Sequence, residues 1–122
     1  MPDVWRIYRI KSCRHTNPRK DKFAVIVCKD VEYMGFLINS TINQYVSRRH
    51  YLLECQVTLS EADYNFLFHA SFLDCTQLYP FDDAELVIGL DLVSDKTKAE
   101  IKSAVSAAKT IATRYKSLIL NN

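Results

Sequence analysis

The chain has 122 residues, of which 48% are hydrophobic and 25% charged, and its formal net charge at pH 7 is +2. A chain of this size and composition can bury one hydrophobic core without stabilising disulfides. The net charge is too small to indicate nucleic-acid binding by itself. We therefore predict a single domain that spans residues 1–122.

The four cysteines are widely separated, and three of them lie in apolar runs, where a free thiol behaves as a small hydrophobic group. They are Cys13, Cys28, Cys55 and Cys75. Their spacing matches no zinc motif, so we predict free thiols in a reducing compartment, with no metal and no other cofactor. No apolar run approaches the roughly 18 residues needed to span a bilayer, and the N-terminus lacks the layout of a signal peptide. We expect a cytoplasmic protein without membrane contact.

The first predicted elements are a strand and a basic loop. Apolar residues alternate with Arg6 and Arg9 over residues 4–10, which predicts an opening strand that pairs with the next two. Residues 12–21 have no apolar periodicity, contain the Asn17-Pro18 turn signal and carry most of the local cations. We therefore predict a surface loop at residues 12–21.

Residues 22–41 form the most regular stretch of the chain. The nearly continuous apolar runs at 23–28 and 33–38 predict two strands covered on both faces, joined by a turn at residues 30–32. An antiparallel pair of this kind brings the start of the first strand next to the end of the second. This hairpin is the predicted centre of the fold.

The middle of the chain predicts shorter elements. We expect an irregular segment at 42–50, a strand at 51–59, a short helix or turn at 60–68 that begins at Ser60, and a strand at 71–78 that ends at Pro80. Acidic residues followed by Gly89 predict one or two helical turns at 82–89. The aromatic residues of 64–68 indicate a lid on the core rather than a platform for stacking bases, and His69 is expected to be packed.

The last segment has helical periodicity from Thr97 to about residue 120. Thr97 and Glu100 match a capping box, and apolar residues recur at the spacing of one helix face. The opposite face carries lysines, which usually indicates a solvated surface. The pattern fits a helix that covers an open end of the sheet and equally a helix that pairs with its copy in a dimer.

These elements together predict a mainly β fold with α elements, of the α+β class. The expected architecture is a small SH3-like antiparallel β-barrel over about residues 4–80, with a short helix and a long C-terminal helix at about 97–120.

Polar residues gather at the ends of the predicted hairpin. Residues 18–22 (PRKDK) precede its first strand, and Asn39, Ser40 and Thr41 follow its second. Because these ends meet in an antiparallel pair, cations, hydroxyls and a carboxamide converge at one rim of the sheet. A second basic cluster, residues 48–50, could face the first. The two interpretations are an ordinary solvated loop and a cradle for phosphate groups.

Several strings of the chain resemble the MazF/PemK superfamily of small β-barrel proteins, in particular its divergent PemK-like members. The matching strings are PRKDKFAVIV, FLINST and DYNFLFHASFLDC, followed by the lysine-rich final helix. The resemblance covers about residues 18–120. It implies a growth-inhibiting toxin of a toxin–antitoxin pair: a metal-independent endoribonuclease that cuts single-stranded RNA, forms a homodimer and is neutralised by an antitoxin protein.

The resemblance also implies roles for particular residues. A basic residue before the second strand and a hydroxyl residue after the third carry catalysis in that family, and they are best matched here by Arg19 and by Ser40 or Thr41. Lys20 and Lys22 are alternatives to Arg19. The residues expected to bind substrate are Lys20, Lys22, Asn39, Arg48, Arg49 and His50.

Some features favour a second hypothesis. The glycine-rich approach to the second strand is missing, and Ala70-Ser71 stands where related sequences tend to have an aspartate-serine pair. A catalytically inactive small-barrel module that binds nucleic acid or a protein, encoded by a phage or mobile element, fits these departures.

Overall fold

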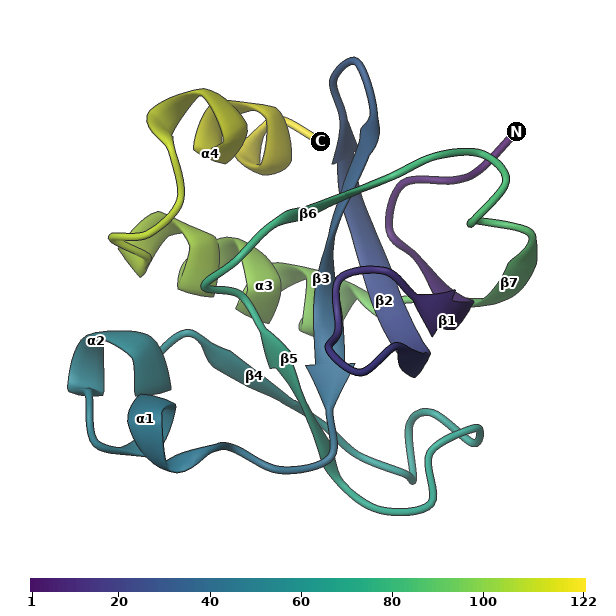
Figure 1. The fold of residues 1–122 in the computed structure, drawn as a ribbon. Coiled ribbons are helices and arrows are strands. Elements are labelled where there is room, and N and C mark those ends of the chain that lie inside the picture. Colours follow the sequence, from purple (N-terminus) through teal and green to yellow (C-terminus); the bar gives the residue numbers. More distant parts are fainter.

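One curled antiparallel sheet forms the body of the protein (Figure 1), in a computed structural model that describes all of residues 1–122. Its strands run in the order β4-β5-β3-β2-β1-β7, and β6 also pairs with β3. The strands are β1 (Arg6–Cys13), β2 (Lys20–Lys29), β3 (Tyr33–Asn39), β4 (Gln56–Leu59), β5 (Ser71–Asp74), β6 (Tyr79–Phe81) and β7 (Ile88–Leu92). The helices are α1 (Gln44–Ser47), α2 (His50–Leu53), α3 (Asp95–Ala107) and α4 (Thr113–Leu120). The predicted α+β class, with a barrel-like antiparallel sheet and a C-terminal helix, is confirmed.

The β2–β3 hairpin lies at the centre of the sheet, as the two apolar runs predict. Its register pairs Val25 with Phe36 and Phe23 with Ile38. Alternate residues of β2 enter two different hydrophobic clusters: Val25 and Val27 belong to the larger, and Ala24 and Ile26 to the smaller. This burial on both faces explains why β2 is continuously apolar rather than alternating.

Helices and a long connection cover the two faces of the sheet. Ile101 and Val105 of α3 and Ile119 of α4 are buried in the larger cluster, so these helices cover the sheet as one of the two sequence interpretations proposed. Phe81, at the end of β6, and Leu86, in the connection from β6 to β7, belong to the smaller cluster. None of the helices is both long and apolar enough to cross a membrane.

The segment after β3 differs from the prediction. Residues 42–50, expected to be irregular, contain α1, which Asn43 caps by accepting a hydrogen bond from the Val46 amide at 2.8 Å. The predicted strand at 51–59 begins only at Gln56, because residues 50–53 form the helical turn α2. Residues 60–68 form turns, within the predicted range of a short helix or turn.

The segment after β5 also differs. The predicted strand at 71–78 stops at Asp74, and Pro80, expected to end a strand, lies inside β6 opposite Met34. Proline is tolerated there because β6 is a three-residue strand at the margin of the sheet. Gly89 does not end a helix but lies in β7, where it pairs with Tyr8 of β1. The sequence did not predict this strand.

The C-terminal helix is two helices rather than one. Ser94, not Thr97, is the N-cap of α3, and its Oγ accepts a hydrogen bond from the Thr97 amide at 3.1 Å. Thr97 is buried instead and accepts a hydrogen bond from the Tyr64 hydroxyl at 2.7 Å. The helix breaks after Ala107, where Ala108 has an extended backbone and Thr110 donates to the Thr76 carbonyl.

Candidate functional site

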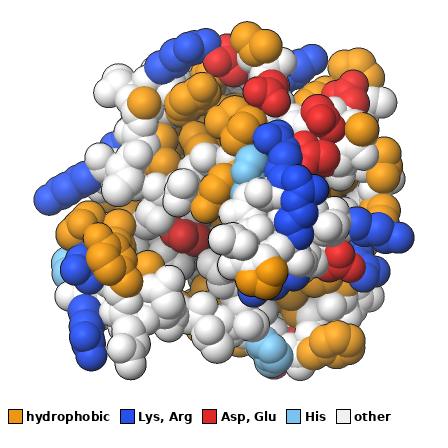
Figure 2. Space-filling model, in the orientation of Figure 1, with side chains coloured by type: hydrophobic (Ala, Val, Ile, Leu, Met, Phe, Trp, Pro, Cys, Tyr) orange, Lys and Arg blue, Asp and Glu red, His pale blue; other side chains and the backbone are white.

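The candidate site lies where β2 begins and β3 ends, at the lower end of the sheet in Figure 1. β5 pairs with this end of β3, with Asn39 opposite Phe72. The loop that precedes β5 is therefore brought to the same rim, although it is distant from the hairpin in the sequence. Most of the acidic side chains visible on the face in Figure 2 lie in its upper part, away from this rim.

Lys22 is the cation most firmly placed at the rim. Its side chain is partly buried, and its Nζ donates a hydrogen bond to Asn39 Oδ1 at 2.7 Å. Burial lowers the pKa of this ammonium, and the neighbouring charge of Lys20 lowers it further. No carboxylate pairs with Lys22, so its charge is available to an anion from outside the protein.

A hollow of about 280 Å³ opens beside Lys22. Its polar lining comes from three segments that converge only in the fold: the start of β2, the end of β3 and the loop before β5. These polar residues are Lys20, Asp21, Lys22, Ser40, His69 and Ser71, and the side chains of Phe66 and Phe68 form part of the apolar wall.

His69 is exposed at this hollow, although the sequence predicts it to be packed. Its Nδ1 lies 2.8 Å from the Ala70 carbonyl oxygen. Because a carbonyl only accepts, Nδ1 carries the proton in this contact, which leaves Nε2 as the basic nitrogen of the neutral ring. Ser71 Oγ donates a hydrogen bond to the His69 carbonyl at 3.2 Å, so the backbone of His69 is held as well as its ring.

The other predicted rim residues are placed less closely. Arg19 is exposed, makes no hydrogen bond or ion pair, and does not line the hollow, although it directly precedes Lys20. Thr41 is also exposed and outside the lining, whereas Ser40 is part of it. Of the two hydroxyl candidates, the geometry therefore favours Ser40.

The second basic cluster is not brought to the hollow. Arg48, Arg49 and His50 lie in and around α1 and α2, which Figure 1 shows at the side of the molecule, beyond β4. The Arg49 guanidinium stacks on the Tyr45 ring, with Cζ 3.5 Å from the ring centroid. His50 is almost fully exposed, with Nε2 3.5 Å from the Glu54 carboxylate. None of the three lines the hollow.

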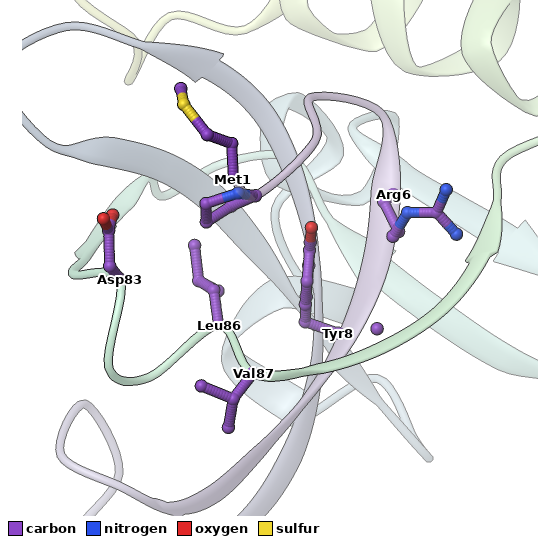
Figure 3. A pocket seen from close by; sticks show the side chains of 8 residues that line it. Met1, Arg6, Tyr8, Asp83, Leu86 and Val87 are labelled. Atoms are coloured by element: carbon purple, nitrogen blue, oxygen red, sulfur yellow. The ribbon is translucent and has the colours of Figure 1, made fainter.

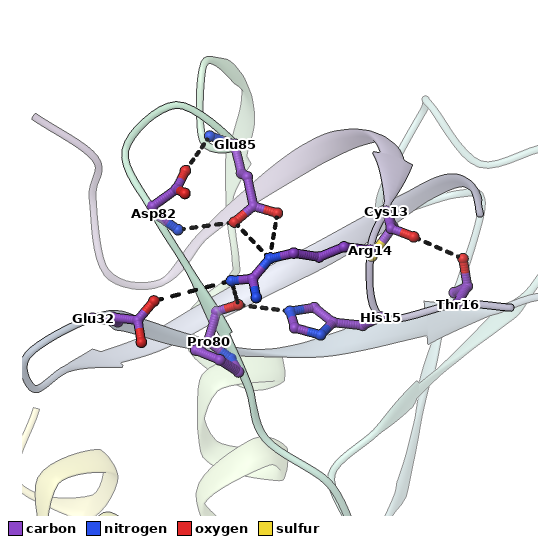
Figure 4. A network of polar contacts seen from close by, with 8 residues as sticks. All are labelled: Cys13, Arg14, His15, Thr16, Glu32, Pro80, Asp82 and Glu85. Atoms are coloured by element: carbon purple, nitrogen blue, oxygen red, sulfur yellow. Dashed lines mark hydrogen bonds and ion pairs between the residues drawn. The ribbon is translucent and has the colours of Figure 1, made fainter.

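The loop that carries Arg19 is anchored at its start (Figure 4). The Arg14 guanidinium bonds the Glu85 carboxylate, with Nε 3.1 Å from Oε2, and donates to the Pro80 carbonyl at 3.0 Å. These contacts with Glu85 raise the pKa of Arg14. His15 Nε2 reaches the same carbonyl at 2.7 Å. Residues 14 and 15 are thus held by Pro80 of β6 and by Glu85, whereas the Arg19 side chain forms no hydrogen bond or ion pair.

A different hollow, of about 520 Å³, lies near the N-terminus (Figure 3). The Arg6 guanidinium is already bonded to Asp3 and to the Leu90 carbonyl, and the Tyr8 hydroxyl accepts from the Asp3 amide. In Figure 3 the Arg6 and Asp83 side chains point away from each other. No polar groups converge there, and none of the predicted site residues lines it.

No model of a protein family matches the chain, and no curated protein matches it either. No group of three or more His, Cys, Asp or Glu side chains is arranged to hold a metal ion.

Sequence patterns do not identify His69 and Phe68 as site residues, because their neighbours in the chain are largely apolar and predict burial. Phe68 is fully exposed and His69 is exposed, whereas Tyr64 and Leu67 in the same loop are buried. The signal that could have found them is the pairing of β5 with the end of β3, which places the residues just before β5 at the rim.

Proposed function

We propose that the protein binds single-stranded RNA at this rim and cleaves it without a metal ion. The observation that carries the proposal is the convergence of Lys22, Ser40 and His69 on one hollow. The three residues come from separate segments and supply a cation, a hydroxyl and a base. Metal-free cleavage of RNA needs groups of these kinds.

The reaction would use the 2′-hydroxyl of the substrate as nucleophile. Its oxygen attacks the adjacent phosphorus as its proton leaves, the bond from phosphorus to the 5′-oxygen breaks, and that oxygen takes up a proton. The products are a 2′,3′-cyclic phosphate and a free 5′-hydroxyl. The protein must therefore accept the proton of the 2′-hydroxyl and stabilise the charge that develops on the phosphate oxygens, while solvent water supplies the proton of the 5′-oxygen.

The residues of the hollow match these requirements. His69 Nε2 would accept the 2′-hydroxyl proton, since Nδ1 is held by the Ala70 carbonyl. Lys22 and Lys20 would neutralise the phosphate, and Ser40 would donate a hydrogen bond to one of its oxygens. Arg19, which directly precedes β2 and lies outside the hollow, would reach over the rim to the same phosphate.

The resemblance to the MazF/PemK superfamily extends the same proposal. On this view the protein is a toxin that inhibits growth by cutting RNA, acts as a homodimer, and is neutralised by an antitoxin with an acidic segment that occupies the basic rim. The fold class, an antiparallel barrel-like sheet with a C-terminal helical cover, supports this part.

A second candidate function is RNA binding without cleavage. It is favoured by the placement of Arg19 outside the hollow, because Arg19 is the best match to the catalytic basic residue of the family. A barrel of this kind would hold a strand at Lys22 and leave it intact.

The test is incubation of the purified protein with a long single-stranded RNA in excess EDTA, followed by mapping of the ends. Discrete cuts with 2′,3′-cyclic phosphate are expected, and they should be lost in His69→Gln and strongly reduced in Ser40→Ala and Arg19→Ala. His50→Gln is the matched control, because that histidine is exposed far from the hollow and should leave cleavage unchanged. Intact RNA that nevertheless binds to the protein would select the second candidate.

A further inference from the structure

A second hollow adjoins the rim hollow and shares lining residues with it: Asp21, Lys22, Phe23, Phe66 and Phe68. Its volume is about 530 Å³, and its apolar lining consists of Phe23, Phe66, Phe68, Ile88 and Leu90. Lys22 lines both hollows. The two are therefore one continuous surface, polar at the Ser40 end and apolar at the β7 end.

The three aromatic side chains of this apolar hollow differ in burial and in packing. The Phe23 and Phe66 rings pack together, with centroids 4.7 Å apart and planes at 55°, and both are partly buried. Phe68 is fully exposed. Phe23 and Phe66 thus form a packed aromatic pair in the lining of the hollow. The Phe68 ring, in the same lining, has no aromatic packing partner.

The charges near the hollow favour an anionic ligand at one place only. Arg9 is paired with Asp21 at 2.9 Å, and Asp21 also accepts a hydrogen bond from the Ser12 amide, so the charge of Arg9 is already balanced. Lys22 bonds only the neutral amide of Asn39. An anion is thus expected at the boundary between the hollows, and a flat apolar group in the apolar hollow beyond it.

A nucleotide has this combination of groups, because a phosphate and an aromatic base are joined through one sugar. We propose that the apolar hollow is a base-binding site, in which a base of the bound RNA strand stacks on Phe68 while a phosphate contacts Lys22. This inference rests on the proposed function, since it requires RNA at the rim. Stacking accepts every base, and the hollow has no unpaired side chain other than Lys22 to read a base edge, so binding should be tolerant of sequence.

The test measures binding of two strands of equal length by fluorescence anisotropy. One is a 2′-O-methyl oligoribonucleotide, which cannot be cut by 2′-hydroxyl attack, and the other is the same backbone without bases. Phe68→Ala should weaken binding of the first by roughly 5- to 150-fold, the range for loss of one stacked base, and leave binding of the second unchanged. Val31→Ala is the matched control, because Val31 is an exposed apolar residue at the opposite end of the hairpin.

A Phe68→Trp variant gives a direct reading of the same contact. The only other tryptophan, Trp5, is buried and provides a constant background. The base-containing strand should quench the emission of this variant, and the abasic strand should not.

The two proposals fail in different ways. If Phe68→Ala binds both strands like the wild type while Lys22→Gln weakens both, the base site is wrong and RNA binding at the rim stands. If the wild type binds the abasic strand as tightly as the base-containing strand, the base site is also wrong. If the wild type binds neither strand, both proposals are wrong.

Discussion

The Lys22 ammonium donates a hydrogen bond to Asn39 Oδ1 at 2.7 Å, across the paired ends of β2 and β3. This contact positions a partly buried cation that has no carboxylate partner. We predict that Lys22→Gln weakens RNA binding and lowers the slope of log K against log salt concentration by about 0.7, the value for one lost phosphate contact on a single strand.

Lys29→Gln provides the matched control for Lys22. Lys29 lies at the other end of β2, where its ammonium is 5.0 Å from the centroid of the Tyr33 ring, and its loss should leave the slope unchanged. Equal slopes for Lys22→Gln and the wild type would remove Lys22 from the binding site.

Gly35 is required by the close approach of β2 and β3. A Cβ at this position would lie 2.6 Å from the Val25 carbonyl oxygen and 2.9 Å from Ile26 Cδ1. The backbone contact cannot be relieved by a rotamer change, so Gly35→Ala should lower the free energy of unfolding by about 1–3 kcal/mol or more in urea titration.

Gly89→Ala is the comparison for this prediction. Its Cβ would meet the Arg6 side chain at 3.2 Å, and that flexible chain can shift. A change within about 0.5 kcal/mol is expected, as for ordinary surface positions. A Gly35→Ala variant as stable as Gly89→Ala would contradict the packing described for the hairpin.

Tyr64 ties the loop before β5 to the start of α3. Its buried hydroxyl donates to Thr97 Oγ1 at 2.7 Å and accepts from the Ser94 amide at 3.1 Å. Tyr64→Phe leaves both partners without this oxygen and should cost about 1–3 kcal/mol in thermal or urea unfolding. Tyr45→Phe should cost nothing measurable, because the Tyr45 side chain is largely exposed and its hydroxyl makes no hydrogen bond.

The thiols give a prediction on reactivity. All four cysteines are free and buried, so the folded protein should not react with a thiol reagent at pH 8, and four groups should react after unfolding in guanidinium chloride. Rapid labelling of the folded protein would show that the core opens far more readily than its burial indicates.

Cys28 also gives a pH dependence of stability. Burial, with a smaller contribution from Asp30, raises the pKa of its thiol from 9.0 to about 11. Between these values the unfolded chain has lost the thiol proton while the folded chain retains it, so the free energy of unfolding falls as pH rises from about 9 to 11. Urea titrations across this range should show a shallower decline for Cys28→Ala than for the wild type.

The elements predicted well from the sequence are those whose pattern is decided by neighbours along the chain. The runs at 23–28 and 33–38 are apolar because both sheet faces are covered, and the turn between them follows directly. The strand β7 was missed because it is an edge strand that contains Gly89 and is only partly buried, so it has no strong apolar pattern. The break between α3 and α4 is not apparent from the sequence, because Ala108 and Ile111, which lie within it, are buried and continue the helical spacing.

The candidate site was predicted in part for the same reason. Lys22 and Asn39 meet because hairpin strands end together, which is a local rule. His69 and Phe68 join them through the pairing of β3 with β5, a contact between distant segments that periodicity does not reveal. Conversely, α1 and α2 place Arg48, Arg49 and His50 away from the rim. The positions of cations in the sequence do not predict how these helices are oriented relative to the rim.

The position of β7 at the edge of the sheet affects the dynamics of the proposed base-binding hollow. β7 is held by β1 alone, and Tyr8 and Gly89, which pair there, are separated by most of the chain. A strand held on one side exchanges its amide hydrogens through local opening, well before the sheet unfolds as a whole. Ile88 and Leu90 line the hollow from β7, so we expect its width to vary with local opening of this strand. Purines and pyrimidines, which differ in size, would then enter the same hollow as the wall moves.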